Sequence, residues 1–168
     1  MRVLIAGVGN VLRGDDGFGV EVLHRLKQEI GAEVGVTFYE SGIAGIGLVQ
    51  QLLDGYDALI LLDAFDRGTV PGTVFVHEPD VAALAAPGPT REPVDLHQAD
   101  PEAVLRLAAT LDALPRRVWV VGCQAADCDE LGAALSEPAR RAIPLAVRQV
   151  HDFLTTVRAD ARGANGSV

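Results

Sequence analysis

Two short signatures of phosphate and hydrolytic chemistry are missing from this sequence. Lysine occurs only once, as Lys27, and no G-x-x-x-x-G-K-[S/T] pattern is present. A P-loop for nucleotide phosphates is therefore excluded, because such a loop depends on its lysine and on the hydroxyl that follows it. The pattern G-x-S-x-G is also absent, which argues against a serine hydrolase with a nucleophile elbow.

Cysteine is scarce as well, since the chain contains only Cys123 and Cys128. Two cysteines cannot build a disulfide framework, and their spacing does not fit a paired zinc knuckle. We expect both to be small, semi-buried residues of a protein in a reducing compartment. Nothing near Cys123 in the sequence would lower the pKa of its thiol, so a cysteine nucleophile is disfavoured.

Long apolar runs and an excess of basic residues are also lacking. No segment approaches the roughly 20 apolar residues that cross a bilayer, and the apolar run at the N-terminus is too short for a signal peptide. The 14 basic residues are outnumbered by 23 acidic ones, for a net charge of −9. We therefore predict a cytoplasmic protein that binds neither membranes nor nucleic acid.

The composition that remains is that of one compact domain. Hydrophobic residues make up 49% of the 168 residues and charged residues 22%, which is typical of a globular protein with a substantial core. We place this domain at residues 1–154. The segment 155–168 has little apolar content, and we expect it to be a disordered tail.

Apolar runs and helical patterns alternate along the chain. Near-continuous apolar runs predict buried parallel strands at 2–8, 58–65 and 117–123, and more mixed runs predict strands at 35–41 and 72–78, at least one of them a sheet edge. Helical periodicity covers 17–30, 101–113 and 136–154. The predicted fold is a single-domain three-layer α/β/α sandwich, with a mostly parallel five-stranded sheet flanked by helices on both faces.

Three further features refine this prediction. In the helix at 101–113, Asp100 is a plausible N-cap, and the buried stripe comprises Val104, Leu105, Ala108 and Leu111. Pro144 should kink or divide the last helix. The segment 82–98 is rich in alanine, proline and glycine, and we expect it to be a long functional loop.

The candidate chemistry lies where the predicted strands end. "GVGNVLRGDDGFGV" at 7–20 resembles a phosphate-binding glycine turn in shape, but Asp15 and Asp16 would repel an anion, which favours a cation. Asp63 closes the apolar run "LILLD", where burial of a carboxylate demands a compensating donor or cation. With His97 from the long loop, two carboxylates and an imidazole could bind nickel, zinc or iron. The alternatives are a helix-terminal role for Asp16 and a simple surface position for His97.

Several ordered motifs resemble the hydrogenase maturation endopeptidases. They are the glycine turn at 7–20, "ESGIAGIGL", "LILLDAF", "PGTV", "DLHQADP" and "GCQAADCDELGAALSEPARRAI", which together span about residues 1–154. The resemblance implies a peptidase that removes the C-terminal extension of a nickel–iron hydrogenase large-subunit precursor after nickel insertion. It also implies that Asp16, Asp63 and His97 contact nickel supplied by that substrate, with no organic cofactor. Family members have either Asp or Glu at the first of these positions.

Other interpretations stay open at this point. The turn "SGIAG" at 41–45 either supplies backbone groups to a bound peptide or simply joins a strand to a helix. A peptidyl-tRNA hydrolase would share the G-x-G-N turn but needs a basic RNA-binding face. A phosphoacceptor receiver module would need a lysine after the last strand, where this chain has "VGCQAAD". A dinucleotide-binding domain is disfavoured by the acids in the would-be phosphate loop.

Overall fold

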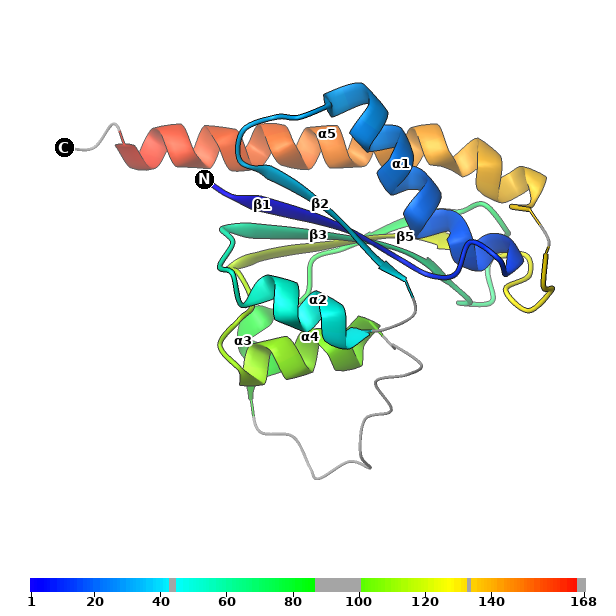
Figure 1. The fold of residues 1–168 in the computed structure, drawn as a ribbon, viewed down its shortest axis with the longest axis horizontal. Coiled ribbons are helices and arrows are strands. Elements are labelled where there is room, and N and C mark those ends of the chain that lie inside the picture. The colour runs from blue at the N-terminus through cyan, green and yellow to red at the C-terminus, as the bar shows by residue number, and fades with distance from the viewer. Residues whose placement is uncertain (43–44, 87–100, 133, 166–168) are drawn as a thin grey trace.

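A five-stranded sheet forms the centre of the molecule (Figure 1). The computed structural model describes residues 1–42, 45–86, 101–132 and 134–165. The sheet order is β2-β1-β3-β5-β4, and all neighbouring strands are parallel except β4, which is antiparallel to β5. The strands are β1 (Val3–Val8), β2 (Val36–Gly42), β3 (Ala58–Phe65), β4 (Val74–His77) and β5 (Arg117–Gln124).

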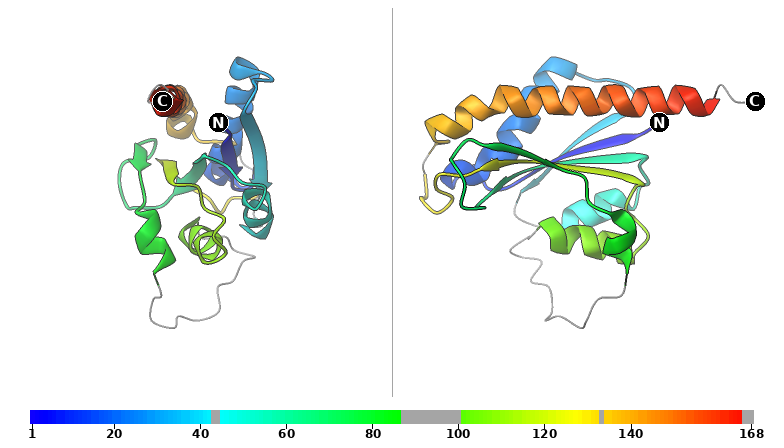
Figure 2. Two further views of the ribbon diagram at one scale, coloured as in Figure 1. Left: turned by 90° about the vertical axis from the view of Figure 1, so that its left-hand side faces the viewer. Right: turned by 180° about the vertical axis from the view of Figure 1, so that it is seen from behind.

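Helices cover both faces of this sheet, which confirms the three-layer α/β/α sandwich. One face carries α1 (Phe18–Ile30) and α5 (Glu137–Asn165), while the other carries α2 (Gly45–Leu52), α3 (Val81–Ala85) and α4 (Pro101–Thr110) (Figures 1 and 2). A short 3-10 helix, η1 (Gly14–Gly17), precedes α1. Within the described ranges, no helix is long and apolar enough to cross a membrane.

The apolar strands alternate their side chains between two separate cores. In β3, Ile60 and Leu62 pack with α1 and α5, whereas Leu59 and Leu61 pack with α2 and α4. This alternation follows from the pleat of a strand, in which successive side chains point to opposite faces. Because helices cover both faces of the sheet, the side chains on both sides of the strand are buried. The strand sequence is therefore apolar without interruption.

The two strands with mixed sequences lie at the two edges of the sheet, where at least one of them was expected. β2 and β4 each pair with only one neighbour, and all described residues of both strands are half-buried or exposed. The antiparallel direction of β4 returns the chain from the carboxyl end of β3 to the opposite end of the sheet. α3 follows this return and lies on the same face of the sheet as α4 (Figure 2).

The predicted end of the last helix near Leu154 is wrong. α5 continues to Asn165, so residues 155–165, expected to be disordered, are helical. Val157 belongs to the core beneath α5, and the next turn is tied down by ion pairs from Arg158 to Glu33 and from Arg117 to Asp160. This part of the helix was not predicted, because one buried valine and two ion pairs leave too little apolar periodicity in the sequence. Residues 166–168 lie outside the described part.

Pro144 lies inside α5 without dividing it. The N-terminal part of the helix bends away from the rest (Figure 1), as expected for an interior proline, which removes one backbone hydrogen bond.

Two local predictions on the α2–α4 face also need correction. Residues 82–85, expected to belong to the long loop, are part of α3, whose N-cap Asp80 accepts hydrogen bonds from Ala82 and Ala83 N–H. Leu111 is 50% exposed because α4 ends at Thr110, although the rest of the predicted stripe is buried. The remainder of the loop, 87–98, and the predicted N-cap Asp100 lie outside the described residues.

Candidate functional site

Asp63 lies at the carboxyl end of β3 and is one of the few buried charged residues, with 5% of its surface exposed. The alternation of β3 puts it on the same face as Leu61 and Phe65, which is the face covered by α2 and α4. Its Oδ1 accepts a hydrogen bond from Ala64 N–H at 2.8 Å. In register, Asp63 pairs with Gly122 of β5. The carboxylate is therefore held at the centre of the sheet's carboxyl edge.

Asp16 reaches the same edge from β1, which is the neighbour of β3 in the sheet. The turn after β1 is tight: Gly9 has φ 117°, and a Cβ on it would lie 1.8 Å from the carbonyl oxygen of Asp16. Only glycine fits there. Asn10 N–H donates to Asp16 Oδ2 at 2.8 Å, and this bond orients the half-buried carboxylate.

Asp15 has a structural role, in contrast to its neighbour. It is 1% exposed, and its carboxylate accepts three hydrogen bonds, from Ala126 N–H (2.7 Å), Ser136 N–H (2.7 Å) and Ser136 Oγ–H (2.8 Å). Ser136 in turn caps α5 through Ala139 N–H. Asp15 thus ties η1 to the exit of β5 and to the start of α5.

Asp16 lies in the first turn of η1, next to the N-cap of α1, but its carboxylate does not cap α1. α1 begins after Gly17, and no side chain caps it within the described residues. The only hydrogen bond that the Asp16 carboxylate accepts from the described residues comes from Asn10 N–H.

The charges of both candidate carboxylates act on Cys128. Burial, together with the negative charges of Asp16, Asp15, Asp63 and Asp129, raises the pKa of its thiol to about 12. Asp16 and Asp63 therefore act on one and the same side chain. From the sequence, Cys128 is expected only to be a small semi-buried residue, because nothing in its local sequence shows that the exit of β5 turns toward the end of β1.

Cys123 is not an accessible nucleophile. Its side chain is 1% exposed in the core beneath α5, and burial, with a contribution from Asp15, raises the pKa of the thiol to about 11. Both cysteines are free thiols, and both are protonated near neutral pH.

The third predicted ligand, His97, lies outside the described residues. In the described ranges, no three His, Cys, Asp or Glu side chains form a group that could hold a metal ion. Two of the other histidines pair with surface carboxylates, His24 with Glu40 (3.1 Å) and His151 with Glu29 (3.3 Å), and His77 ends β4. The described part therefore contributes two carboxylates, Asp16 and Asp63, to the predicted site.

The same fold and sequence pattern occur in proteins of known family. The family described as "HycI: Hydrogenase maturation protease" matches residues 20–152. The hydrogenase expression/formation protein HupD of Rhizobium leguminosarum bv. viciae is 34% identical over 167 residues, which cover 97% of this chain and 81% of HupD. That alignment reaches beyond the family match and covers most of the chain.

Solved structures agree with this assignment. The hydrogenase maturating endopeptidase HybD from E. coli superposes with a TM-score of 0.75 at 25% identity, covering 94% of both chains. The hydrogenase 2 maturation peptidase from Thaumarchaeota archaeon SCGC_AB-539-E09 gives a TM-score of 0.70 at 30% identity, covering 92% of this chain and 99% of that one. The sequence and the architecture thus agree, and this chain belongs to the hydrogenase maturation protease family and is a peptidase.

Proposed function

We propose that this peptidase removes the C-terminal extension of a nickel–iron hydrogenase large-subunit precursor after nickel has been inserted. In this proposal Asp16, Asp63 and His97 bind nickel that the precursor carries, so that cleavage reports successful metal loading. Family membership supports the reaction class. The position of two carboxylates at the ends of adjacent strands supports the metal contact.

The observation that carries the proposal is the division of roles between the adjacent aspartates. Asp15 uses both of its oxygens within the fold, while Asp16 is half-buried and shares one neighbourhood with the buried Asp63. Carboxylate and imidazole ligands suit nickel, zinc and iron alike, so the donor set does not select the metal. A metal that arrives on the substrate needs only a part of its coordination shell from the enzyme.

The proposed hydrolysis uses water as the nucleophile. Both thiols have raised pKa values, so neither supplies a thiolate near neutral pH. Nickel on the substrate would polarise the scissile carbonyl or activate a water molecule. Water adds to the carbonyl carbon, the C–N bond breaks, and the leaving amine takes a proton. Asp16 and Asp63 hold the substrate metal in place for this step.

We also propose that the reaction takes place in the cytoplasm and needs no organic cofactor. The two free thiols, Cys123 and Cys128, suit a reducing compartment.

The decisive experiment is the mass of the large-subunit precursor from the same organism before and after incubation with this protein. We expect a C-terminal fragment to be released from nickel-loaded precursor and not from a nickel-free control. Equal cleavage of both forms would keep the peptidase and remove nickel as the recognition signal. Absence of cleavage from a competent, nickel-loaded precursor would overturn the proposed substrate.

Variants then test the three ligands. His97→Ala and Asp63→Asn should slow processing strongly, whereas Asp57→Asn, at the opposite end of β3, should leave it unchanged. Unchanged processing by both His97→Ala and Asp63→Asn would show that the ligand assignment is wrong even if the substrate is right.

A further inference from the structure

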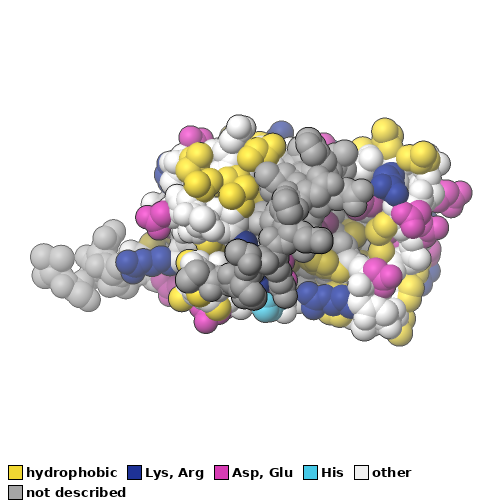
Figure 3. All heavy atoms as spheres, turned by 90° about the horizontal axis from the view of Figure 1, so that it is seen from below, with side chains coloured by type: hydrophobic (Ala, Val, Ile, Leu, Met, Phe, Trp, Pro, Cys, Tyr) yellow, Lys and Arg dark blue, Asp and Glu magenta, His cyan; other side chains and the backbone are white. Residues whose placement is uncertain are grey.

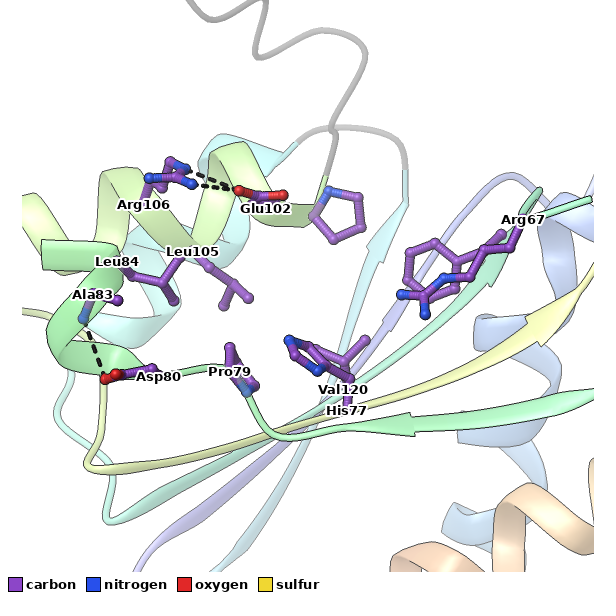
Figure 4. Close-up of a pocket in the computed structure, with 12 residues that line it drawn as sticks. Arg67, His77, Pro79, Asp80, Ala83, Leu84, Glu102, Leu105, Arg106 and Val120 are labelled. Carbon is purple, nitrogen blue, oxygen red and sulfur yellow. Dashed lines mark hydrogen bonds and ion pairs between the residues drawn. The ribbon is translucent and has the colours of Figure 1, made fainter. Parts of the chain in front are cut away.

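A cavity of about 430 Å³ lies next to the site, between the sheet and the helices α3 and α4 (Figure 4). Its apolar walls include Phe65, Leu84, Leu105 and Val120. Figure 4 shows Arg67 on the opposite side of the cavity from Leu84. Seen from the side of α2 and α4, the surface has basic, acidic and hydrophobic side chains next to one another (Figure 3). The cavity lining likewise combines apolar side chains with two arginines and two carboxylates.

Phe65 connects this cavity to Asp63. The two residues are two positions apart on one face of β3, which corresponds to about 7 Å along the strand. The ring of Phe65 lies across Gly122, where an added Cβ would come within 2.3 Å of ring atoms. Because Gly122 pairs with Asp63 in register, the floor of the cavity begins beside the candidate metal ligand. An extended peptide whose scissile bond lies at Asp63 would reach the cavity within about two to four residues.

The acidic groups of the cavity are already engaged. The carboxylate of Asp80 caps α3, and Glu102 forms an ion pair with Arg106 on the same helix. Arg67 differs from them: its guanidinium lies 5.2 Å from the ring centroid of Phe65 and 5.1 Å from that of Phe75. Among the described residues it has no carboxylate partner. Stacking on aromatic rings leaves the in-plane N–H groups of a guanidinium available to a carboxylate, which they can bind with two parallel hydrogen bonds.

The backbone beneath Arg67 is fixed by a buried side chain. Gln124, 3% exposed at the end of β5, accepts hydrogen bonds from Arg67 N–H (2.8 Å) and Thr69 N–H (3.3 Å). Its amide donates to Asp66 at 3.1 Å. Gln124 thus fixes the chain between β3 and β4 in one geometry. A preorganised arginine loses less conformational entropy when it binds a carboxylate.

We propose that this cavity is a specificity subsite that binds an acidic side chain of the substrate polypeptide near the scissile bond. Arg67 binds the carboxylate, and an apolar neighbour in the peptide packs against Leu84 and Leu105. This inference rests on the proposed function, because it takes the occupant to be the polypeptide that is cleaved. The occupant follows from charge complementarity at Arg67: the lining carries two arginines and two carboxylates, and Arg67 is the arginine that forms no ion pair with a described residue.

Binding is tested first, without any cleavage. Full-length protein with labelled leucine and valine methyl groups is titrated with acetyl-Gly-Leu-Gly-Glu-Gly-amide and with the same peptide carrying Gln in place of Glu. We expect shifts at Leu84, Leu105 and Val120 and about tenfold tighter binding of the Glu peptide, in the range of one charge-assisted contact. Arg67→Gln should remove this preference, and Arg67→Lys should retain a part of it. Arg25→Gln, on α1, should change nothing.

Equal binding of the two peptides, or shifts confined to other parts of the molecule, would overturn the subsite. The cleavage assay gives an independent reading: Arg67→Gln should raise KM for the loaded precursor about tenfold with kcat unchanged. If the wild-type protein cleaves the precursor and Arg67→Gln leaves KM unchanged, the subsite is wrong and the proposed function stands. If the wild-type protein does not cleave but prefers the Glu peptide through Arg67, the proposed function fails and the subsite stands.

Discussion

An aspartate lies at each end of strand β3, and the two side chains differ in burial and in their charged neighbours. Asp57, just before β3, has a side chain that is 61% exposed and lies 3.7 Å from the N-terminal amine. Asp63, at the other end, is 5% exposed and shares its surroundings with Asp16 and Asp15. At the amino end, water and a cation neutralise a surface acid. At the carboxyl end, burial concentrates negative charge, and that is the condition for binding a cation.

The largest expected effect is a difference in cleavage activity between variants of these two aspartates. If the proposed function holds, Asp63→Asn should lower kcat/KM for the nickel-loaded precursor by about 10²–10³, because the substrate metal would lose a charged ligand. Asp57→Asn should leave the rate unchanged and lower the free energy of unfolding by less than about 1 kcal/mol, as is usual for an exposed ion pair. Cleavage kinetics and urea denaturation of both variants check this. Similar rates for the two variants would remove the functional distinction between the two ends.

Substitution of a glycine should destabilise the protein more at the carboxyl end of the sheet than at the amino end. A Cβ at Gly19 would lie 2.2 Å from the carbonyl oxygen of Leu62 and 2.6 Å from that of Val8, so Gly19→Ala must push α1 off the sheet. We expect a loss of about 3 kcal/mol in the free energy of unfolding. Gly55, at the amino end, has φ 78° with open space around it, so Gly55→Ala should cost only about 1 kcal/mol of backbone strain. Urea denaturation midpoints of the two variants measure the difference, and equal losses would contradict the close packing of α1.

Asp15→Asn should destabilise the fold by about 2–3 kcal/mol. The amide would place a donor where Asp15 Oδ2 now accepts from Ala126 N–H, and that N–H would lose its partner. Thermal or urea unfolding measures the loss, with Asp57→Asn as the control. A loss no greater than that of the control would show that the three hydrogen bonds of Asp15 do not stabilise the turn.

The smallest expected effect is on the alkylation rate of Cys128, which depends on the negative charge at the carboxyl end of the sheet. Its pKa of about 12, against 9.0 for an unperturbed thiol, makes the neutral thiol more stable in the folded state. This stabilisation is present below pH 9 and is lost as the pH rises toward 12. Iodoacetamide should therefore alkylate Cys128 slowly at pH 8.5, and Asp16→Asn should accelerate the reaction several-fold by removing a nearby negative charge.

Mass spectrometry of the alkylated peptide gives the rate for Cys128. Cys123 is an internal control, because its 1% exposure should keep it unmodified in the folded protein. An unchanged rate in Asp16→Asn would mean that Asp16 and Cys128 do not share one electrostatic environment.

Most of the layered architecture could be predicted from the sequence. Apolar runs identified β1, β3 and β5 as buried strands, and mixed runs identified β2 and β4 as candidates for the edges. The short helices α2 and α3 were not among the predicted helical segments. The five residues of α3 are too few for a helical period, and it buries no side chain.

The candidate site could be predicted only in part. Asp16 and Asp63 were placed at the carboxyl edge because parallel neighbouring strands must end there together. The proximity of Cys128 and the stacking of Arg67 on Phe65 and Phe75 had no local signal. Both features depend on tertiary structure: the path of the chain after β5 and the antiparallel return of β4. The apolar periodicity of a single segment predicts neither of these.

The sequence by itself determined the strands, the order of strand and helix, and the pair of aspartates after β1, because apolar periodicity and turn residues act over short stretches of chain. Only the tertiary structure decided which aspartate stabilises the fold and which faces the candidate site. Asp15 finds its donors at Ala126 and Ser136, 111 and 121 residues away, and Asp16 finds its donor six residues away. A carboxylate satisfied by distant backbone groups is fixed by packing, and the choice between two identical neighbours follows from the direction in which the turn points each side chain.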